Sequence, residues 1–233
     1  MYSIVRDFEA MKAIFVAPFV LLRVLAVALV LSPSAAAEEP LAQATRPPPS
    51  SLEYLITGVA LSAEAVASPA DLCPDDAGSA PCILERGLGL GIRAGYRTRG
   101  AWYAGGAYEF SRHESSNLLR LAIMQQLRAE VRYYMDLGTR ATPYLGFGVG
   151  AVIYGNEWGA DTGGVAGMLG PGIEFAVTQD LSVGAALYYR PMLLRAYEDT
   201  VDQHRADGVF GFGTTHLVGL EFIVELRDPL PRW

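Results

Sequence analysis

A histidine and a serine two residues apart, His113 and Ser115, are the pair in this sequence best suited to nucleophilic chemistry. Side chains at positions i and i+2 of a β-strand lie on the same face, so this spacing would place an imidazole beside a hydroxyl. Together with a carboxylate, such a pair can act as base and nucleophile in acyl transfer. No well-placed acid is apparent on that face, and we therefore interpret both residues as a solvent-exposed strand end.

A larger set of ionisable residues lies among small residues, at positions separated by an even number of residues within each segment. It contains five arginines and five glutamates: Arg93, Glu109, Arg120, Arg128, Glu130, Arg132, Glu174, Arg190, Glu221 and Glu225. Equal numbers of the two charges can neutralise one another if the chain encloses them together. Whether the chain encloses these charges depends on the structure of the segments that carry them.

Residues 118–136 give the clearest pattern. Arg128, Glu130 and Arg132 share one parity, whereas Leu127 and Val131 share the other. Helical periodicity would scatter both sets around an axis, but a strand separates them onto two faces. Only Gln125 clearly departs from the rule. The pattern therefore predicts a long strand with an apolar face and an enclosed polar face.

The same alternation continues through residues 142–190, where the second face is small rather than polar. Gly146, Gly148 and Gly150 alternate with apolar residues, and later strands add Ala, Ser and single charged residues. A soluble half-buried strand would instead turn a polar face to water. Small inward residues and a few charges are typical of a narrow closed barrel with lipid outside. A soluble β-sandwich or a lipocalin-like barrel is the alternative.

Eight strands are predicted over residues 52–65, 83–98, 101–111, 118–136, 143–154, 165–177, 181–190 and 215–226. Short connections (97–100, 137–142, 178–180) alternate with long ones (66–82, 112–117, 155–164, 196–214), as in outer-membrane barrels. An even strand count would put both chain termini of the barrel in the periplasm. We expect interfacial girdles to include Tyr54, Tyr96, Trp102, Tyr133, Tyr144, Tyr154, Trp158 and Tyr189. The predicted fold is an all-β, antiparallel, up-and-down transmembrane barrel.

The N-terminal region predicts export. Lys12 precedes an apolar run from Ala13 to Leu31, and small residues follow at Ser34–Ala37, the pattern of a cleaved signal peptide. We expect a signal peptide at 1–37, a Pro-rich periplasmic lead at 38–51, the barrel at 52–227 and a tail at 228–233. An uncleaved membrane anchor is the alternative for the first segment.

The only two cysteines, Cys73 and Cys82, lie in the first long loop. In an exported chain, an isolated pair that closes a short loop is most simply a disulfide, worth about 2–3 kcal/mol. A metal site would need further ligands, and none are adjacent. Gly89 and Gly91 lie in mid-strand without the helix and lysine of a phosphate-binding loop, so we expect no cofactor. The net charge of −7 argues against a nucleic-acid partner.

The chain resembles the small eight-stranded outer-membrane barrels of the OmpA, OmpX and OmpW kind. The resemblance is carried by residues 142–150, by residues 170–184 and by the closing alternating strand. It implies an outer-membrane location, outer-membrane lipid, lipopolysaccharide and the barrel assembly machinery as partners, and a monomer. Members usually end on an aromatic residue that closes the last strand. Here Pro229 and Pro231 follow that strand and would break its ladder, and Trp233 would have to substitute.

Several functions are consistent with these patterns. In an eight-stranded barrel, side chains fill the interior, so the charges would form a plug and the protein would support the envelope. A narrow channel for small solutes is the alternative. A lipid A-modifying enzyme is a second one, because outer-membrane deacylases resemble this size and use a His-x-Ser pair. The two long outer loops would also suit surface interactions.

Overall fold

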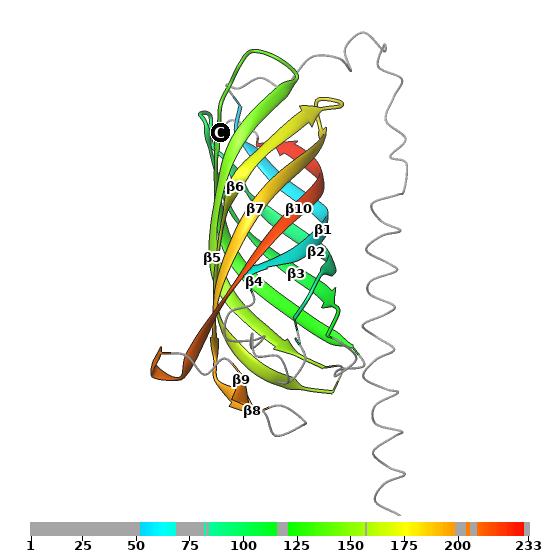
Figure 1. Cartoon of the computed structure of the whole chain (residues 1–233). Coiled ribbons are helices and arrows are strands. Elements are labelled where there is room, and N and C mark those ends of the chain that lie inside the picture. The colour runs from blue at the N-terminus through cyan, green and yellow to red at the C-terminus, as the bar shows by residue number, and fades with distance from the viewer. Residues whose placement is uncertain are drawn as a thin grey trace, which may run out of the picture. The chain divides into compact units, whose positions relative to one another are not determined.

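Eight long antiparallel strands close into a barrel in the computed structural model, in the order β1-β10-β7-β6-β5-β4-β3-β2 (Figure 1). The strands are β1 (Tyr54–Ser68), β2 (Gly87–Arg97), β3 (Trp102–His113), β4 (Ala122–Tyr134), β5 (Ala141–Gly155), β6 (Ala160–Ala176), β7 (Leu181–Arg195) and β10 (Phe212–Pro229). The structure describes residues 52–68, 82, 84–115, 121–156, 158–198, 204–205 and 209–230. The predicted fold class is confirmed.

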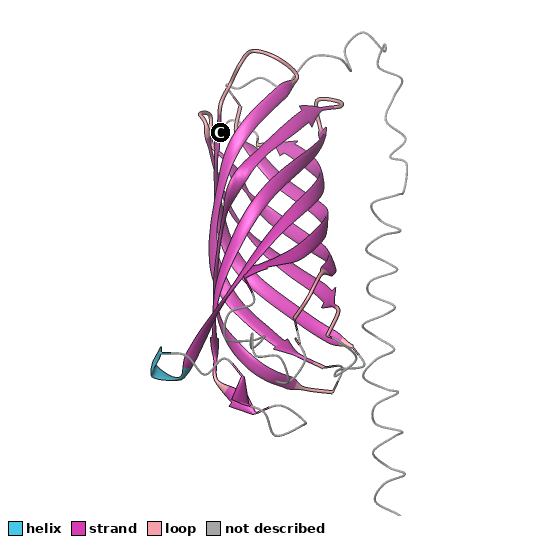
Figure 2. Cartoon of the chain, viewed as in Figure 1, coloured by secondary structure: helices cyan, strands magenta, loops and turns pink. Residues whose placement is uncertain are grey.

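Buried and exposed side chains alternate along the strands, as the alternation in the sequence predicted. Along β4, Arg128 and Arg132 are buried, whereas Leu127 and Val131 are exposed. This is the reverse of a soluble barrel, in which aliphatic side chains fill the core. The described chain is almost entirely strand (Figure 2). Among the described residues, no helix is long and apolar enough to cross a membrane.

The two ends of the barrel differ in their connections. We call the end that holds the connections 98–101, 135–140 and 177–180 the turn end; Tyr54 and Pro229 pair there, so both barrel termini lie at that end. The opposite, loop end holds the connections 69–86, 114–121, 156–159 and 196–211. The long loop predicted at 155–164 was wrong. β6 begins at Ala160, because its glycines extend the pairing with β5 as far as Gly155.

Strand lengths also depart from the prediction near Pro229 and Tyr197. β10 continues through Pro229, which pairs with Tyr54, so this proline does not break the ladder after Leu226. A proline is tolerated at the end of a strand, where its missing N–H costs little. The predicted loop 196–214 contains a small hairpin of β8 (Tyr197–Glu198) and β9 (His204–Arg205), and a 3-10 turn, η2 (Val209–Gly211).

The outer surface of the barrel is an apolar band with aromatic residues near its edges. The rings of Trp102 and Tyr133 pack at a tilt, with centroids 4.9 Å apart, near the turn end, and Tyr96 is also exposed. The predicted girdle was partly wrong, since Tyr54, Tyr144 and Tyr154 are buried inside the barrel. These three tyrosines have inward parity, and proximity to a strand end does not reveal which way a side chain points.

Candidate functional site

The barrel interior gathers most of the predicted charged set. Nine of its ten members lie inside with at most 5% of their surface exposed: Arg93, Glu109, Arg128, Glu130, Arg132, Glu174, Arg190, Glu221 and Glu225. Arg120 lies outside the described residues. The nine residues come from six strands, so closure of the barrel is what brings them together.

The network's loop-side half centres on Arg190 and Arg128. Both guanidinium groups donate to Glu109, with N–O distances of 2.6 Å from Arg190 and 2.7 Å from Arg128. Arg190 also pairs with Glu64, and Ser62 Oγ donates to Glu109 at 2.6 Å. Each carboxylate is therefore held by charged or hydroxyl donors, which is what makes a buried ion pair tolerable.

Toward the turn end, the network continues through Arg93 and Arg132. Arg93 pairs with Glu221 at 2.6 Å, and Glu221 also accepts from Arg128 at 3.2 Å, which links the two halves. Arg132 pairs with Glu225 at 2.7 Å. Its guanidinium also lies 4.9 Å from the ring centroid of Tyr103 and 5.1 Å from that of Tyr144, within the range of cation–π attraction.

Three members of the network were missed by sequence reasoning: Glu64, Arg97 and Arg227. Arg227 pairs with Glu174, Arg97 lies 3.8 Å from the same carboxylate, and Glu64 pairs with Arg190. All three continue the inward parity of their strands near or beyond the predicted strand ends. Following the period for one or two more residues would have found Arg97 and Arg227. With them, the described interior holds six arginines and six glutamates.

The prediction that the candidate catalytic pair forms a solvent-exposed strand end was wrong. His113 and Ser115 are both buried, because β3 extends to His113 and turns it inward. An acid also lies beside it, contrary to expectation: His113 Nε2 is 3.2 Å from Glu64 Oε2. The hydroxyl that the structure places beside the imidazole is that of Ser111, 2.9 Å from the same nitrogen.

This geometry does not suit acyl transfer. In a catalytic triad the carboxylate holds one imidazole nitrogen and the nucleophile contacts the other. Here Glu64 and Ser111 both approach Nε2 of His113, while Nδ1 lies 3.2 Å from the backbone carbonyl oxygen of Glu85. The side chains of His113 and Glu64 are also fully buried. The cluster therefore joins the connection after β1 to the interior network.

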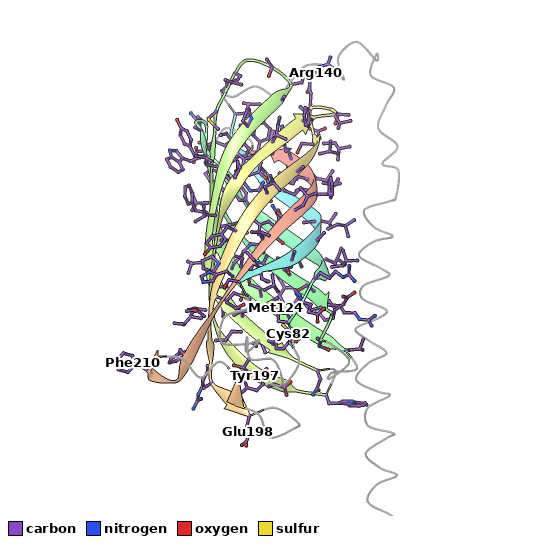
Figure 3. The ribbon with its side chains drawn as sticks, viewed as in Figure 1. Cys82, Met124, Arg140, Tyr197, Glu198 and Phe210 are labelled. Atoms are coloured by element: carbon purple, nitrogen blue, oxygen red, sulfur yellow. The ribbon has the colours of Figure 1, made fainter. Side chains whose placement is uncertain are left out.

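An apolar cluster fills the interior at the loop end. It contains Leu84, Ala122, Met124, Val152, Tyr154, Ala166, Met192, Leu194 and Leu217. Met124 and Cys82 lie near this end, whereas Arg140 lies at the opposite end (Figure 3). Leu84 belongs to no strand, yet it is almost completely buried among residues of five strands. The segment before β2 therefore places a leucine in the mouth of the barrel.

Little empty space remains around the charges. The cavity that reaches Arg93, Glu130 and Glu221 has a volume of about 20 Å³, room for about one water molecule. The pocket beside Arg132, Glu174 and Glu225 has no room for a water. Among the described residues, no group of three or more His, Cys, Asp or Glu is placed to hold a metal ion. The spaces beside these charges are thus at most the size of one water molecule.

The predicted disulfide stays a prediction. Cys82 is partly buried and packs against the apolar cluster, whereas Cys73 lies outside the described residues. The position of Cys82, two residues before Leu84, means that a bridge from it would restrain the segment that fills the mouth.

Comparison with solved structures finds other small outer-membrane barrels. Neisserial surface protein A is 14% identical, with a TM-score of 0.51 over 76% of this chain and 97% of that one. Ail of Yersinia pestis is 12% identical, with a TM-score of 0.41 over 76% and 97%, and OprG of Pseudomonas aeruginosa is 13% identical, with a TM-score of 0.40 over 80% and 98%. At 14% identity, the likeness to neisserial surface protein A concerns the fold alone. A comparison with curated protein sequences finds no match.

A family model supplies the sequence evidence that the structural likenesses lack. The model of the outer membrane protein β-barrel domain matches residues 24–212, which is most of the chain and includes seven of the eight long strands. The exposed apolar band and the enclosed charges agree with it. The chain belongs to the outer membrane protein β-barrel domain family.

Proposed function

We propose that this protein is a sealed barrel that supports the outer-membrane envelope and presents its loop end for surface interactions. The observation that carries the proposal is the double filling of the interior. A charge network joins seven of the eight strands across the lumen, counting Glu64 on β1, and an apolar cluster with Leu84 at its centre fills the loop end. A barrel of eight strands has just enough interior for its own side chains.

The channel alternative requires a continuous aqueous path, which the packing opposes. A solute would have to displace Leu84 and its neighbours and then separate pairs such as Arg93–Glu221 and Arg132–Glu225. Breaking a buried ion pair by removing one partner costs about 3–5 kcal/mol, and several pairs lie in series. Passive flow of small solutes is therefore disfavoured.

The enzyme alternative is disfavoured by the same enclosure. His113 and Glu64 have no exposed side-chain surface, and the acid and the hydroxyl compete for one imidazole nitrogen. A lipid substrate on the outside of the barrel would not reach them. We infer that the His113 cluster has a structural role, in which its Nδ1–H donates to the Glu85 carbonyl and holds the segment that carries Leu84.

Conductance measurements test the sealed-barrel proposal directly. The mature chain, refolded and inserted into planar lipid bilayers, is expected to show no current steps above background, while a 16-stranded porin inserted the same way supplies the positive control. Heat-modifiable migration on an unboiled gel checks that the inserted protein is folded. Reproducible steps from pure folded protein would overturn the proposal in favour of the channel.

The orientation belongs to the same proposal. We propose that residues 1–37 are removed on export, that the turn end and both barrel termini face the periplasm, and that the barrel assembly machinery inserts a monomer among lipopolysaccharide. An epitope inserted at Gly159 on the loop end is expected to bind antibody on intact cells, whereas one inserted at Gly138 on the turn end is not. The opposite labelling pattern would refute this orientation.

A further inference from the structure

A groove crosses the outer face of the barrel over β6, β7, β10 and β1. Its volume is about 620 Å³, and the area it exposes is almost all apolar. Its outward-facing lining includes Ala63, Ala65, Leu169, Pro171, Leu187 and Leu220. This face is continuous with the apolar band that contacts lipid in a membrane barrel. The chemistry of the lining therefore fits hydrocarbon.

Small residues create the hollow. Ala63 and Ala65 are the outward residues of β1 at this level; Ala63 lies between Leu220 of β10 and Leu88 of β2, and Ala65 lies beside Val218 of β10. The lining also includes the backbone of Gly170 and Gly219, which have the inward parity of their strands. On the outer face, the two methyl groups of Ala63 and Ala65 leave a depression beside Leu220, which pairs with Leu187 of β7.

A polar pair lies at the loop-side edge of the groove. Tyr189 lines the groove, and its hydroxyl is 2.6 Å from Nδ1 of His216, with the two rings stacked 5.7 Å apart. Both residues face outward on adjacent strands. Because Nδ1 is engaged by Tyr189, Nε2 is the imidazole nitrogen available to donate to a ligand oxygen.

The depth of His216 matches the boundary of the hydrocarbon layer. The outward residues of β10 between His216 and Asp228 are Val218, Leu220, Phe222, Val224 and Leu226, all apolar. Twelve residues at about 3.4 Å each, tilted by about 40°, span roughly 30 Å, against an apolar band of about 25 Å. His216 thus lies at headgroup level when Asp228 lies at the other surface.

We propose that this groove binds one lipid A molecule: an acyl chain fills the hollow over Ala63 and Ala65, and a phosphate oxygen accepts a hydrogen bond from His216. The choice of lipid A, the phosphorylated acyl lipid of the outer leaflet, rests on the proposed orientation of the loop end. The binding chemistry itself, a hydrocarbon groove that ends at a hydrogen-bond donor for phosphate, does not depend on that orientation.

Lipid binding can be measured on the folded mature chain. The protein in an uncharged detergent is titrated with lipid A, and native mass spectrometry measures the bound fraction. Filling the groove with the double variant Ala63→Leu/Ala65→Leu is expected to weaken binding at least tenfold. The matched control Ala129→Leu/Ala151→Leu adds the same bulk to exposed positions of β4 and β5 and is expected to bind like the wild type.

A separate measurement tests the proposed hydrogen bond from His216 to the phosphate. The variant His216→Ala is expected to weaken lipid A binding about tenfold, the loss of one charge-assisted hydrogen bond. With fully dephosphorylated lipid A, the wild type and this variant are expected to bind alike. Equal weakening by the groove and control variants, or no effect of filling the groove, overturns the proposed site. Equal loss with both lipids overturns the phosphate contact.

All variants lie on the outer surface, and heat-modifiable migration reports whether each one folds. A groove variant that does not fold is replaced by Ala63→Trp, whose fluorescence is measured in vesicles with brominated acyl chains and added lipid A. The proposal expects lipid A to displace the quenching chains at this position and not in Ala129→Trp. Identical quenching at the two positions overturns it. Antibody labelling of the epitopes tests orientation independently.

Discussion

Large inward side chains in this barrel lie across from glycines on the neighbouring strand. Along β4 and β5, Arg128 pairs with Gly150, Glu130 with Gly148 and Arg132 with Gly146. A Cβ at Gly150 would come within 2.8 Å of Arg128 Cβ and closer still to backbone. Gly148 and Gly150 of β5 therefore leave the space that Arg128 of β4 occupies.

Gly219 offers a test of this complementarity. A Cβ there would overlap the ring of Tyr188, which cannot move away easily because its hydroxyl donates to Glu64 at 2.7 Å. Gly219→Ala is expected to lower the free energy of unfolding by about 1–3 kcal/mol, the usual effect of overpacking. Urea titration in lipid vesicles measures it. The control Gly106→Ala, where the nearest atom is 3.6 Å away, should change little; equal effects would refute the argument.

The charge network should depend strongly on Arg190. Its guanidinium pairs with Glu64 and Glu109, and all three side chains are buried. Arg190→Met leaves two carboxylates without their shared cation, so we expect a loss of about 3–5 kcal/mol. Urea titration again gives the value. Arg86→Met, which removes an exposed pair with Glu114, should cost less than about 1 kcal/mol. A similar small cost for Arg190→Met would mean that water reaches the network.

Among the elements, the β6–β7 ladder is the least regular. Pairing is continuous from Gly164 to Ala166, resumes at Leu169 and then at Gly172, and is interrupted between these positions. Pro191 on β7 lies opposite Gly167 in the first gap and Pro171 on β6 lies in the second, and neither has an N–H to donate. In a membrane, unpaired backbone groups are costly, so we expect this seam, the β6–β7 ladder, to be the least stable strand pairing of the described barrel.

Hydrogen exchange should reveal that seam. The amide of Gly167, which faces β7 opposite Pro191, is expected to exchange at least tenfold faster than those of the β3–β4 ladder, whose pairing is continuous from Trp102 to His113. Pro191→Val restores a donor opposite Gly167 and is expected to slow exchange there. The measurement is mass spectrometry of peptic peptides from the folded protein. Uniform protection around the barrel would show that the prolines do not weaken the ladder.

The sequence predicted the strands much better than it predicted their ends. Parity alone identified which face of β4 points into the barrel, because charged and aliphatic residues there lie almost completely on opposite faces. Gln125, its exception, is explained by Tyr108, whose hydroxyl donates to the Gln125 side chain at 2.7 Å on the outer surface. Strand ends were missed where glycine or proline continues a ladder, as at Ala160 and Pro229.

Contacts across the lumen could not be predicted. Glu64 and Arg190 are 126 positions apart and meet only because the barrel closes with one particular stagger, which parity does not determine. Leu84 was missed for a different reason. It lies just before β2, carries no periodic signal, and becomes part of the core only through its position at the mouth.

At the scale of the whole barrel, the interior consists of two layers along the axis. The apolar cluster occupies the loop end and the charge network extends from Glu64 to Arg227 at the turn end. The layers oppose flow by different means: the first excludes water, and the second holds fixed, neutralised charges with room for about one water molecule beside Arg93. Either layer by itself should be sufficient to block ions.

This redundancy predicts a non-additive result in planar bilayers. Leu84→Ser alone should not conduct, because the pairs around Arg93 still close the lumen, and Arg93→Ser/Glu221→Ser alone should not conduct, because the apolar cluster remains. The triple variant opens both layers and is expected to give small current steps. Conductance from Leu84→Ser alone would show that the charge network is permeable to ions, and that the leucine in the mouth is the only barrier.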